Sequence, residues 1–237
     1  MGLACLAFSA SGQITTEGTD FWFGFMDNVR DQTSGIEIYI SANETTDVTV
    51  SIPNSPFSTS VTVVPSASTR IEIPLEYMPT DESKYNFGIH VTSDQPISVY
   101  ALNKRSFSAD AAVILPTPAL GSEYYVFAHR EPPGDGTGND LESELLIVAT
   151  EDGTEVEITT TADSWSAFLK GVPRTITLNA GQTYQIKSDQ DLSGTYIRTK
   201  GDSNGDCKNI AVFGGNKFTN VGGCGGFHDH LYEQMFP

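Results

Sequence analysis

The sequence has few cysteines, few basic residues and no long apolar run, and each shortage excludes a class of protein. Lysine and arginine total 13 against 30 acidic residues, for a formal net charge of −17 over 237 residues. Such a chain repels the phosphates of nucleic acids and of anionic lipids, so we expect neither as a partner. No apolar run approaches the roughly 18 residues of a membrane-spanning helix, and we predict no membrane insertion. Hydrophobic residues still make up 38% of the chain, which is enough for a packed core.

The N-terminus has the features of the end of a secretory signal peptide. An apolar stretch over residues 3–8 is followed by Ala10 and Gly12, two small residues that fit a cleavage before Gln13. Residues 1–12 are therefore predicted to be a signal-peptide remnant, and the chain to be secreted or displayed at the cell surface. A tail without fixed structure is the alternative interpretation.

Export also bears on the cysteines, because exported proteins commonly form disulfides. Of the 3 cysteines, Cys5 lies in the N-terminal stretch, which leaves Cys207 and Cys224. Two cysteines in an exported chain predict one structural disulfide, which contributes about 3 kcal/mol in the chain-entropy account. Two free or metal-binding thiols are the alternative.

Apolar and polar residues alternate in several short runs, which is the pattern of half-buried antiparallel strands. The runs lie at residues 36–40, 48–52, 71–73, 155–159 and 175–178. Turn sequences such as Asp152-Gly153 and Asn179-Ala180-Gly181 separate them. Since no long amphipathic helix is found, the sequence predicts an all-β fold.

Four landmarks recur in the same order about a hundred residues apart, which indicates an internal repeat. The corresponding pairs are residues 36–48 and 144–156, 70–74 and 174–178, 90–93 and 196–199, and 95–103 and 208–216. Each half then ends on an apolar-proline step, Leu115-Pro116 and Phe236-Pro237. We therefore predict two tandem β-sandwich-like units of antiparallel strands, residues 13–116 and residues 117–237.

The longest segment without a strand pattern, residues 131–144, is rich in proline, glycine and acidic residues. It is predicted to be a surface loop at one end of the second sandwich, where ligand contacts concentrate. The candidate contact residues are Asp135, Asp140, Glu142 and Glu144. Their carboxylates could also hold calcium, although no cofactor is predicted for the chain.

Two further clusters have a possible metal chemistry and a more ordinary structural interpretation. Asp202, Asn204 and Asp206 resemble the start of a calcium loop, but the required glycine and final carboxylate do not follow, so an acidic turn is predicted. His228, Asp229 and His230 offer zinc-ligand types. In a strand, however, Asp229 points away from the two histidines, so a structural role is predicted and no catalytic or metal-binding residue is assigned.

The aromatic strand at residues 21–25 is predicted to pack in the core, with a sugar-stacking platform as the alternative. The glycine-rich residues 222–226 lack the lysine that follows a phosphate loop and are predicted to let the backbone bend near Cys224.

Several motifs, in order along nearly the whole chain, together resemble the N-terminal domain family of the IgG Fc-binding protein, found in secreted and surface proteins. They are residues 18–25 (GTDFWFGF), 90–103 (HVTSDQPISVYALN), 109–110 (AD), 115–116 (LP), 120–125 (LGSEYY), 149–154 (ATEDGT), 178–184 (LNAGQTY) and 229–235 (DHLYEQM). The resemblance implies an extracellular, β-rich, non-catalytic module that binds glycoproteins or glycans or serves adhesion. Alternatives are a structural spacer in a large surface protein and a metal-dependent glycan hydrolase centred on His228, Asp229 and His230.

Overall fold

The computed structural model describes residues 15–130, 142–201, 205, 207–221 and 228–237. Within these residues helix is limited to two short 3-10 turns, η1 (Leu75–Tyr77) and η2 (Thr117–Ala119), and none is long and apolar enough to cross a membrane. Every pairing between the described strands is antiparallel. The predicted all-β, sandwich-like class of antiparallel strands is therefore confirmed.

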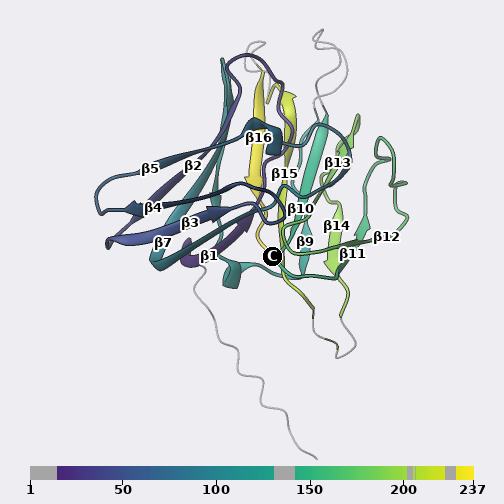
Figure 1. Cartoon of the computed structure of the whole chain (residues 1–237). Coiled ribbons are helices and arrows are strands. Elements are labelled where there is room, and N and C mark those ends of the chain that lie inside the picture. Colours follow the sequence, from purple (N-terminus) through teal and green to yellow (C-terminus); the bar gives the residue numbers. More distant parts are fainter. Residues whose placement is uncertain (1–14, 131–141, 202–204, 206, 222–227) are drawn as a thin grey trace, which may run out of the picture.

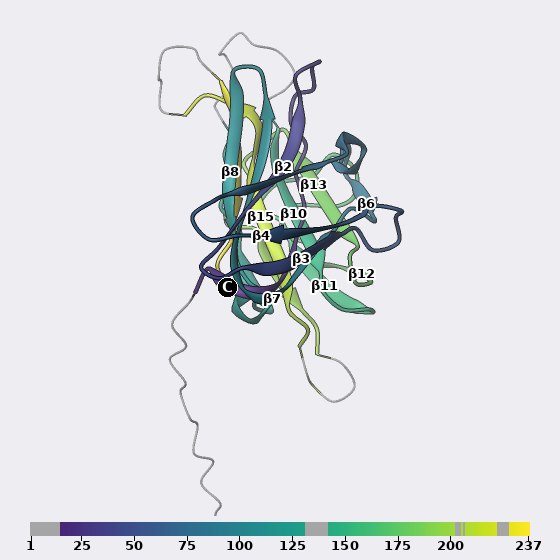
Figure 2. The same ribbon diagram turned by 60° about the vertical axis from the view of Figure 1, so that its left-hand side comes forward.

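A seven-stranded sheet takes all its strands from the first half of the chain. They are β1 (Glu17–Phe23), β2 (Gly35–Ala42), β3 (Thr46–Ser51), β4 (Ser58–Val63), β5 (Thr69–Ile73), β7 (Ile89–Arg105) and β8 (Ser108–Ile114). Their order is β4-β3-β7-β2-β5, and β1 and β8 also pair with β7. Because β7 pairs with β3 through its first part and with β2 through its second, the sheet turns, and Figure 2 shows β3 and β4 running across the direction of β2 and β8.

The remaining strands form two sheets. The five-stranded sheet has the order β16-β15-β10-β13-β6, and the four-stranded sheet has the order β12-β11-β14-β9. The first contains β6 (Ser83–Tyr85), β10 (Ser143–Ala149), β13 (Thr183–Ser188), β15 (Ile210–Thr219) and β16 (Asp229–Gln234). The second contains β9 (Glu123–Tyr125), β11 (Thr154–Thr159), β12 (Arg174–Leu178) and β14 (Tyr196–Thr199). Thus β6 is a first-half strand that completes a sheet of the second half.

The three sheets stack as layers, with the five-stranded sheet in the middle (Figure 1). One apolar core joins the seven-stranded sheet to Leu146, Phe213 and Tyr232 of the middle sheet. A second core joins Leu145 and Val212, on the opposite face of the middle sheet, to the four-stranded sheet. The middle sheet is therefore buried on both faces, which is why β10 carries a continuous apolar run where the outer strands alternate.

The two halves of the chain share one order of strand pairings. In the first half β2 pairs with β5 and β7, and in the second half β10 pairs with β13 and β15. In the same way β3 pairs with β4 and β7, while β11 pairs with β12 and β14. Two landmark asparagines occupy matching places: Asn103 Nδ2 donates to the Met26 carbonyl at 2.9 Å, and Asn216 Nδ2 to the His129 carbonyl at 2.7 Å.

The apolar-proline steps also match. A Cβ added to Gly18 would lie 2.4 Å from the Cβ of Pro116, and one added to Gly121 would lie 2.3 Å from the Cβ of Pro237. In each half, a glycine near the first strand therefore leaves room for the closing proline.

One predicted correspondence between the halves is wrong. Residues 70–74 lie at β5, and the strand that pairs in the corresponding way in the second half is β13. Residues 174–178 instead form β12, which corresponds to β4. The boundary between residues 116 and 117 stays a prediction.

Candidate functional site

An apolar groove lies where the edges of two sheets meet, between β9 of the four-stranded sheet and β16 of the five-stranded sheet. Its volume is about 490 Å³, and aromatic residues Tyr125, Phe127 and Phe236 lie along it. Their exposed fractions are 63%, 78% and 58%, which is high for side chains of this size. We call this hollow the edge groove.

Two glycines on β15 allow the groove wall to form. After β9 the chain leaves its sheet, and Phe127 N donates to the Met235 sulfur at 3.2 Å. A Cβ on Gly214 would lie 2.1 Å from the Phe127 carbonyl oxygen, and a Cβ on Gly215 would lie 1.8 Å from the Leu231 carbonyl oxygen. Because Gly214 and Gly215 have no side chains, the backbone of both groove walls can approach β15 closely.

The groove also carries two carboxylates. Burial raises the pKa of Asp110, and the nearby charge of Asp229 raises it further, against hydrogen bonds from the backbone of Tyr232 and Ala111. Burial raises the pKa of Glu233 as well, with a contribution from the charge of Asp110. The edge groove thus combines exposed aromatic rings with a pair of acidic acceptors.

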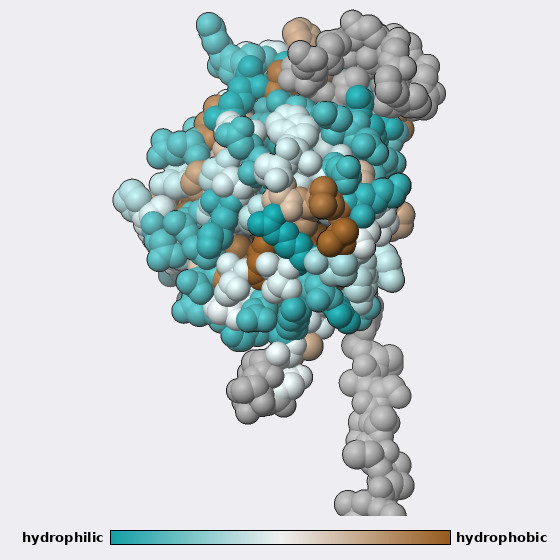
Figure 3. Space-filling model, turned by 90° about the vertical axis from the view of Figure 1, so that its right-hand side faces the viewer, coloured by the Kyte–Doolittle hydropathy of each residue, from teal (hydrophilic) through white to brown (hydrophobic). Residues whose placement is uncertain are grey.

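The opposite side of the four-stranded sheet contrasts with the groove. Figure 3 views the molecule from that side and shows a face that is mostly hydrophilic, with apolar atoms in small groups. Leu169 and Val172, on the loop between β11 and β12, are 65% and 52% exposed. Scattered apolar side chains of this kind are normal on a soluble surface, so they indicate no site.

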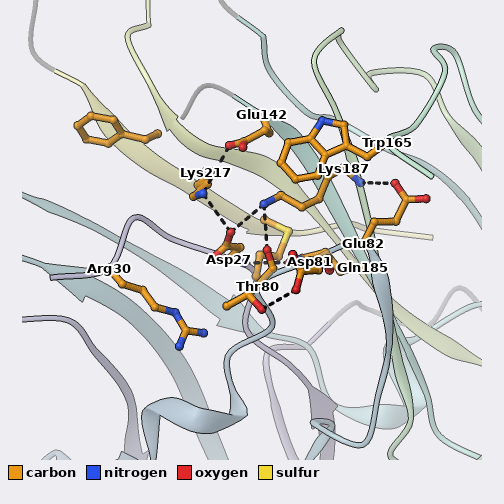
Figure 4. A network of polar contacts seen from close by, with 12 residues as sticks. Asp27, Arg30, Thr80, Asp81, Glu82, Glu142, Trp165, Gln185, Lys187 and Lys217 are labelled. Atoms are coloured by element: carbon orange, nitrogen blue, oxygen red, sulfur yellow. Dashed lines mark hydrogen bonds and ion pairs between the residues drawn. The ribbon is translucent and has the colours of Figure 1, made fainter. Parts of the chain in front are cut away.

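A network of charges lies inside the molecule, between the seven-stranded and five-stranded sheets (Figure 4). Lys187, on β13, is fully buried, and its Nζ lies 2.7 Å from Oδ2 of Asp27. Lys217, on β15, reaches the same oxygen at 3.3 Å and Oε2 of Glu142 at 3.8 Å. The Thr80 carbonyl accepts a hydrogen bond from Lys187 Nζ at 3.3 Å, and the Trp165 ring lies 4.6 Å from the same atom.

The network contains two of the four predicted contact residues. Glu142 is 3% exposed and Glu144 is 0% exposed, so both carboxylates lie in the interior, and Glu144 belongs to β10. Asp135 and Asp140 lie outside the described residues. The repeat landmark at residues 144–156 begins at Glu144, which agrees with its place in β10, but the acidic composition gave no sign that Glu142 and Glu144 are buried. The proposed contact role of the loop therefore stays a prediction.

The predicted disulfide stays untested, because Cys207 is exposed and Cys224 lies outside the described residues. The calcium alternative at Asp202, Asn204 and Asp206 falls outside them too, as do the predicted signal-peptide remnant of residues 1–12 and the glycine-rich residues 222–226.

The histidine cluster makes structural contacts. Asp229 accepts a hydrogen bond from the Ala109 N–H at 2.8 Å, and the His230 ring nitrogen Nδ1 lies 3.2 Å from the Lys217 carbonyl. The His228 ring lies 5.3 Å from that of Phe218. Over the described part of the chain, no group of three or more His, Cys, Asp or Glu side chains is placed to hold a metal ion.

In the aromatic strand, Phe21, Phe23 and Phe25 are buried, which confirms the predicted core role.

The buried histidine makes stability depend on pH. Burial lowers the pKa of His230 to about 4, against its ordinary 6.5. As the pH falls from 6.5 toward 4, the unfolded chain binds a proton that the folded chain does not, so the fold loses stability by about 3 kcal/mol. Denaturant titrations across this range are expected to show a steeper loss in the wild type than in His230→Phe. Equal slopes for the two proteins would contradict this account.

Comparisons with known proteins identify the family of the chain. The family described as IgGFc binding protein matches residues 110–237, more than half of the chain. The human IgGFc-binding protein is 27% identical over 208 residues, which cover 84% of this chain and 4% of that protein. No solved structure matches. The chain belongs to the IgGFc binding protein family.

Proposed function

We propose that this chain is a non-catalytic extracellular module that binds a glycoprotein through its glycan, and that the edge groove supplies the contact surface. One observation carries the proposal: Tyr125, Phe127 and Phe236 stay exposed around a hollow of about 490 Å³. Flat aromatic faces suit the apolar faces of sugar rings, and the carboxylates of Asp110 and Glu233 accept hydrogen bonds from sugar hydroxyls. Ligand pockets generally combine an apolar lining with a few polar groups.

The relative's name supports the binding part of the proposal. The human protein is named for binding the Fc part of immunoglobulin G, and this chain corresponds to a small share of its length. A secreted or cell-surface location follows from the predicted signal-peptide remnant and fits a Cys207–Cys224 disulfide. Adhesion within a larger surface protein is then the expected role.

A structural spacer in a large surface protein is the rival interpretation, and it predicts no ligand. The test is binding of the purified chain to immobilised mucin and immunoglobulin G, with a non-glycosylated protein as control. Each surface is measured with and without EDTA. Saturable binding to a glycoprotein surface supports the proposal, and EDTA sensitivity would indicate a calcium requirement. No binding to any surface contradicts it and favours the spacer.

Phe127→Ala is expected to weaken binding to the glycoprotein surface about tenfold, because an exposed aromatic anchor at an interface contributes 1–2 kcal/mol. The same change is expected to shift stability by less than about 0.5 kcal/mol, since the ring is mostly in solvent. Leu169→Ala is the matched control, because Leu169 is 65% exposed and does not line the groove. A fall in binding that is equal in both variants would contradict the assignment of the groove.

A further inference from the structure

The charge network places a lysine and an aspartate from distant parts of the chain in direct contact. Asp27 follows β1, and its N–H donates to the Gln185 Oε1 at 2.9 Å, which anchors the residue over β13. Lys187 lies on β13, and its Nζ is 2.7 Å from Oδ2 of Asp27. Reactants held in this geometry gain the effective concentration of an intramolecular reaction.

The surroundings exclude water from the pair. The exposed fraction of the Lys187 side chain is 0%, and that of Asp27 is 4%. Amide formation requires the neutral amine and the neutral carboxylic acid, and transfer of one proton across the 2.7 Å contact from Nζ to Oδ2 yields both. The burial of the pair disfavours hydrolysis of the product.

A third ionisable side chain lies on the neighbouring strand. Glu144 on β10 is the direct cross-strand partner of Lys187 on β13, so both side chains project from the same face of the middle sheet. Neither carboxyl oxygen of Glu144 has a hydrogen-bond partner among the described residues. Burial raises the pKa of Glu144 well above its ordinary value. A buried carboxyl group of raised pKa, on the same sheet face as the lysine, is suited to act as a general acid and base.

We propose that the chain cross-links itself through an amide between Lys187 Nζ and Asp27 Cγ, with Glu144 as the proton shuttle. The Nζ lone pair attacks Cγ, and the Glu144 carboxyl donates its proton to an Asp27 oxygen. The tetrahedral carbon then expels that oxygen as water while Nζ returns a proton to Glu144. The Nζ–Cγ bond replaces one Cγ–O bond, one water leaves, and no oxidant or co-reactant is needed.

Neighbouring groups hold the reactants. The Thr80 carbonyl fixes the Lys187 ammonium or amine at 3.3 Å, and the Lys217 Nζ stays 3.3 Å from Asp27 Oδ2, where it stabilises negative charge on the oxygen. The amide links the first half of the chain to the second across the core. An extracellular chain with this bond would keep both halves together under load or partial proteolysis.

The test is the intact mass of the purified, denatured 237-residue chain. The expected mass is lower than that of the sequence by one water, and digestion is expected to yield a branched peptide joining the segments with Asp27 and Lys187. A succinimide at Asp152-Gly153 loses the same water, so the branched peptide is the deciding observation. Full sequence mass, water loss without a branch, or a branch at Lys217 would each overturn the proposal.

Three variants test the roles of the groups. Lys187→Arg and Asp27→Ala are expected to show full sequence mass with no branched peptide. Glu144→Gln keeps a neutral side chain of the same shape and so is expected to stay folded by circular dichroism while losing the branch. Glu157→Gln, at the exposed pair with Arg198, is the control and is expected to keep the lighter mass. A branched peptide in folded Glu144→Gln would overturn the shuttle role.

Discussion

Lys187→Met is expected to lower the free energy of unfolding by about 3–5 kcal/mol, because it leaves the buried carboxylate of Asp27 without its closest cation. Lys217 stays near this carboxylate, with its Nζ 3.3 Å from Oδ2 of Asp27. For a chain of this size the melting temperature would fall by roughly 10 °C, since each kcal/mol shifts it by about 2–4 °C. Loss of a covalent link between residues 27 and 187 would add to this effect. Thermal and denaturant unfolding of both proteins gives the comparison.

Arg198→Met is the matched control for this change. Arg198 also pairs with a carboxylate, that of Glu157, but its side chain is 51% exposed. Exposed pairs contribute about 0–1 kcal/mol, so the control is expected to unfold almost like the wild type. If both substitutions destabilise equally, the buried network has no special role in stability.

Gly215→Ala is expected to destabilise the fold by about 3 kcal/mol or more, at the upper end of the range for overpacked sites. The added Cβ would lie 1.8 Å from the Leu231 carbonyl oxygen and 3.0 Å from the Met26 methyl carbon. The carbonyl belongs to the backbone of β16, so relief requires β16 to move away from β15. Because β16 also forms one wall of the edge groove, glycoprotein binding is expected to fall with stability.

Gly171→Ala separates steric overlap from backbone strain. Gly171 has a φ of +71°, but a Cβ there has no neighbour within 4 Å. Its replacement is expected to cost about 1 kcal/mol, the usual strain of an alanine in the left-handed region. Denaturant midpoints measure both variants. A smaller loss for Gly215→Ala than for Gly171→Ala would contradict the packing described for β15 and β16.

The outer layers could be predicted from the sequence because their strands face water on one side. Alternation at residues 36–40 and 155–159 corresponds to β2 and β11, and the predicted turn glycines Gly153 and Gly181 have φ of +64° and +74°. The pairing order that the two halves share also has local marks in the sequence, at Asn103 and Asn216. Periodicity alone does not distinguish one alternating strand from the next, so the predicted correspondence of residues 70–74 with residues 174–178 is wrong.

The middle layer and the site depend on contacts between distant segments. Strand β10 is buried on both faces, so it lacks the alternation that would have included Glu144. The pairing of Lys187 with Asp27 joins residues 160 positions apart and arises from the stacking of sheets. The edge groove likewise depends on the positions of β9 and β16 as edge strands of their sheets.

Calorimetric titration of the purified chain with a glycoprotein and with its enzymatically deglycosylated form tests the central claim most directly. The account predicts saturable binding to the intact glycoprotein, a loss of most of that affinity after deglycosylation, and a weaker titration with Phe127→Ala. Equal affinity for both forms would contradict glycan recognition at the edge groove, and no binding to either form would contradict the proposal of a binding module.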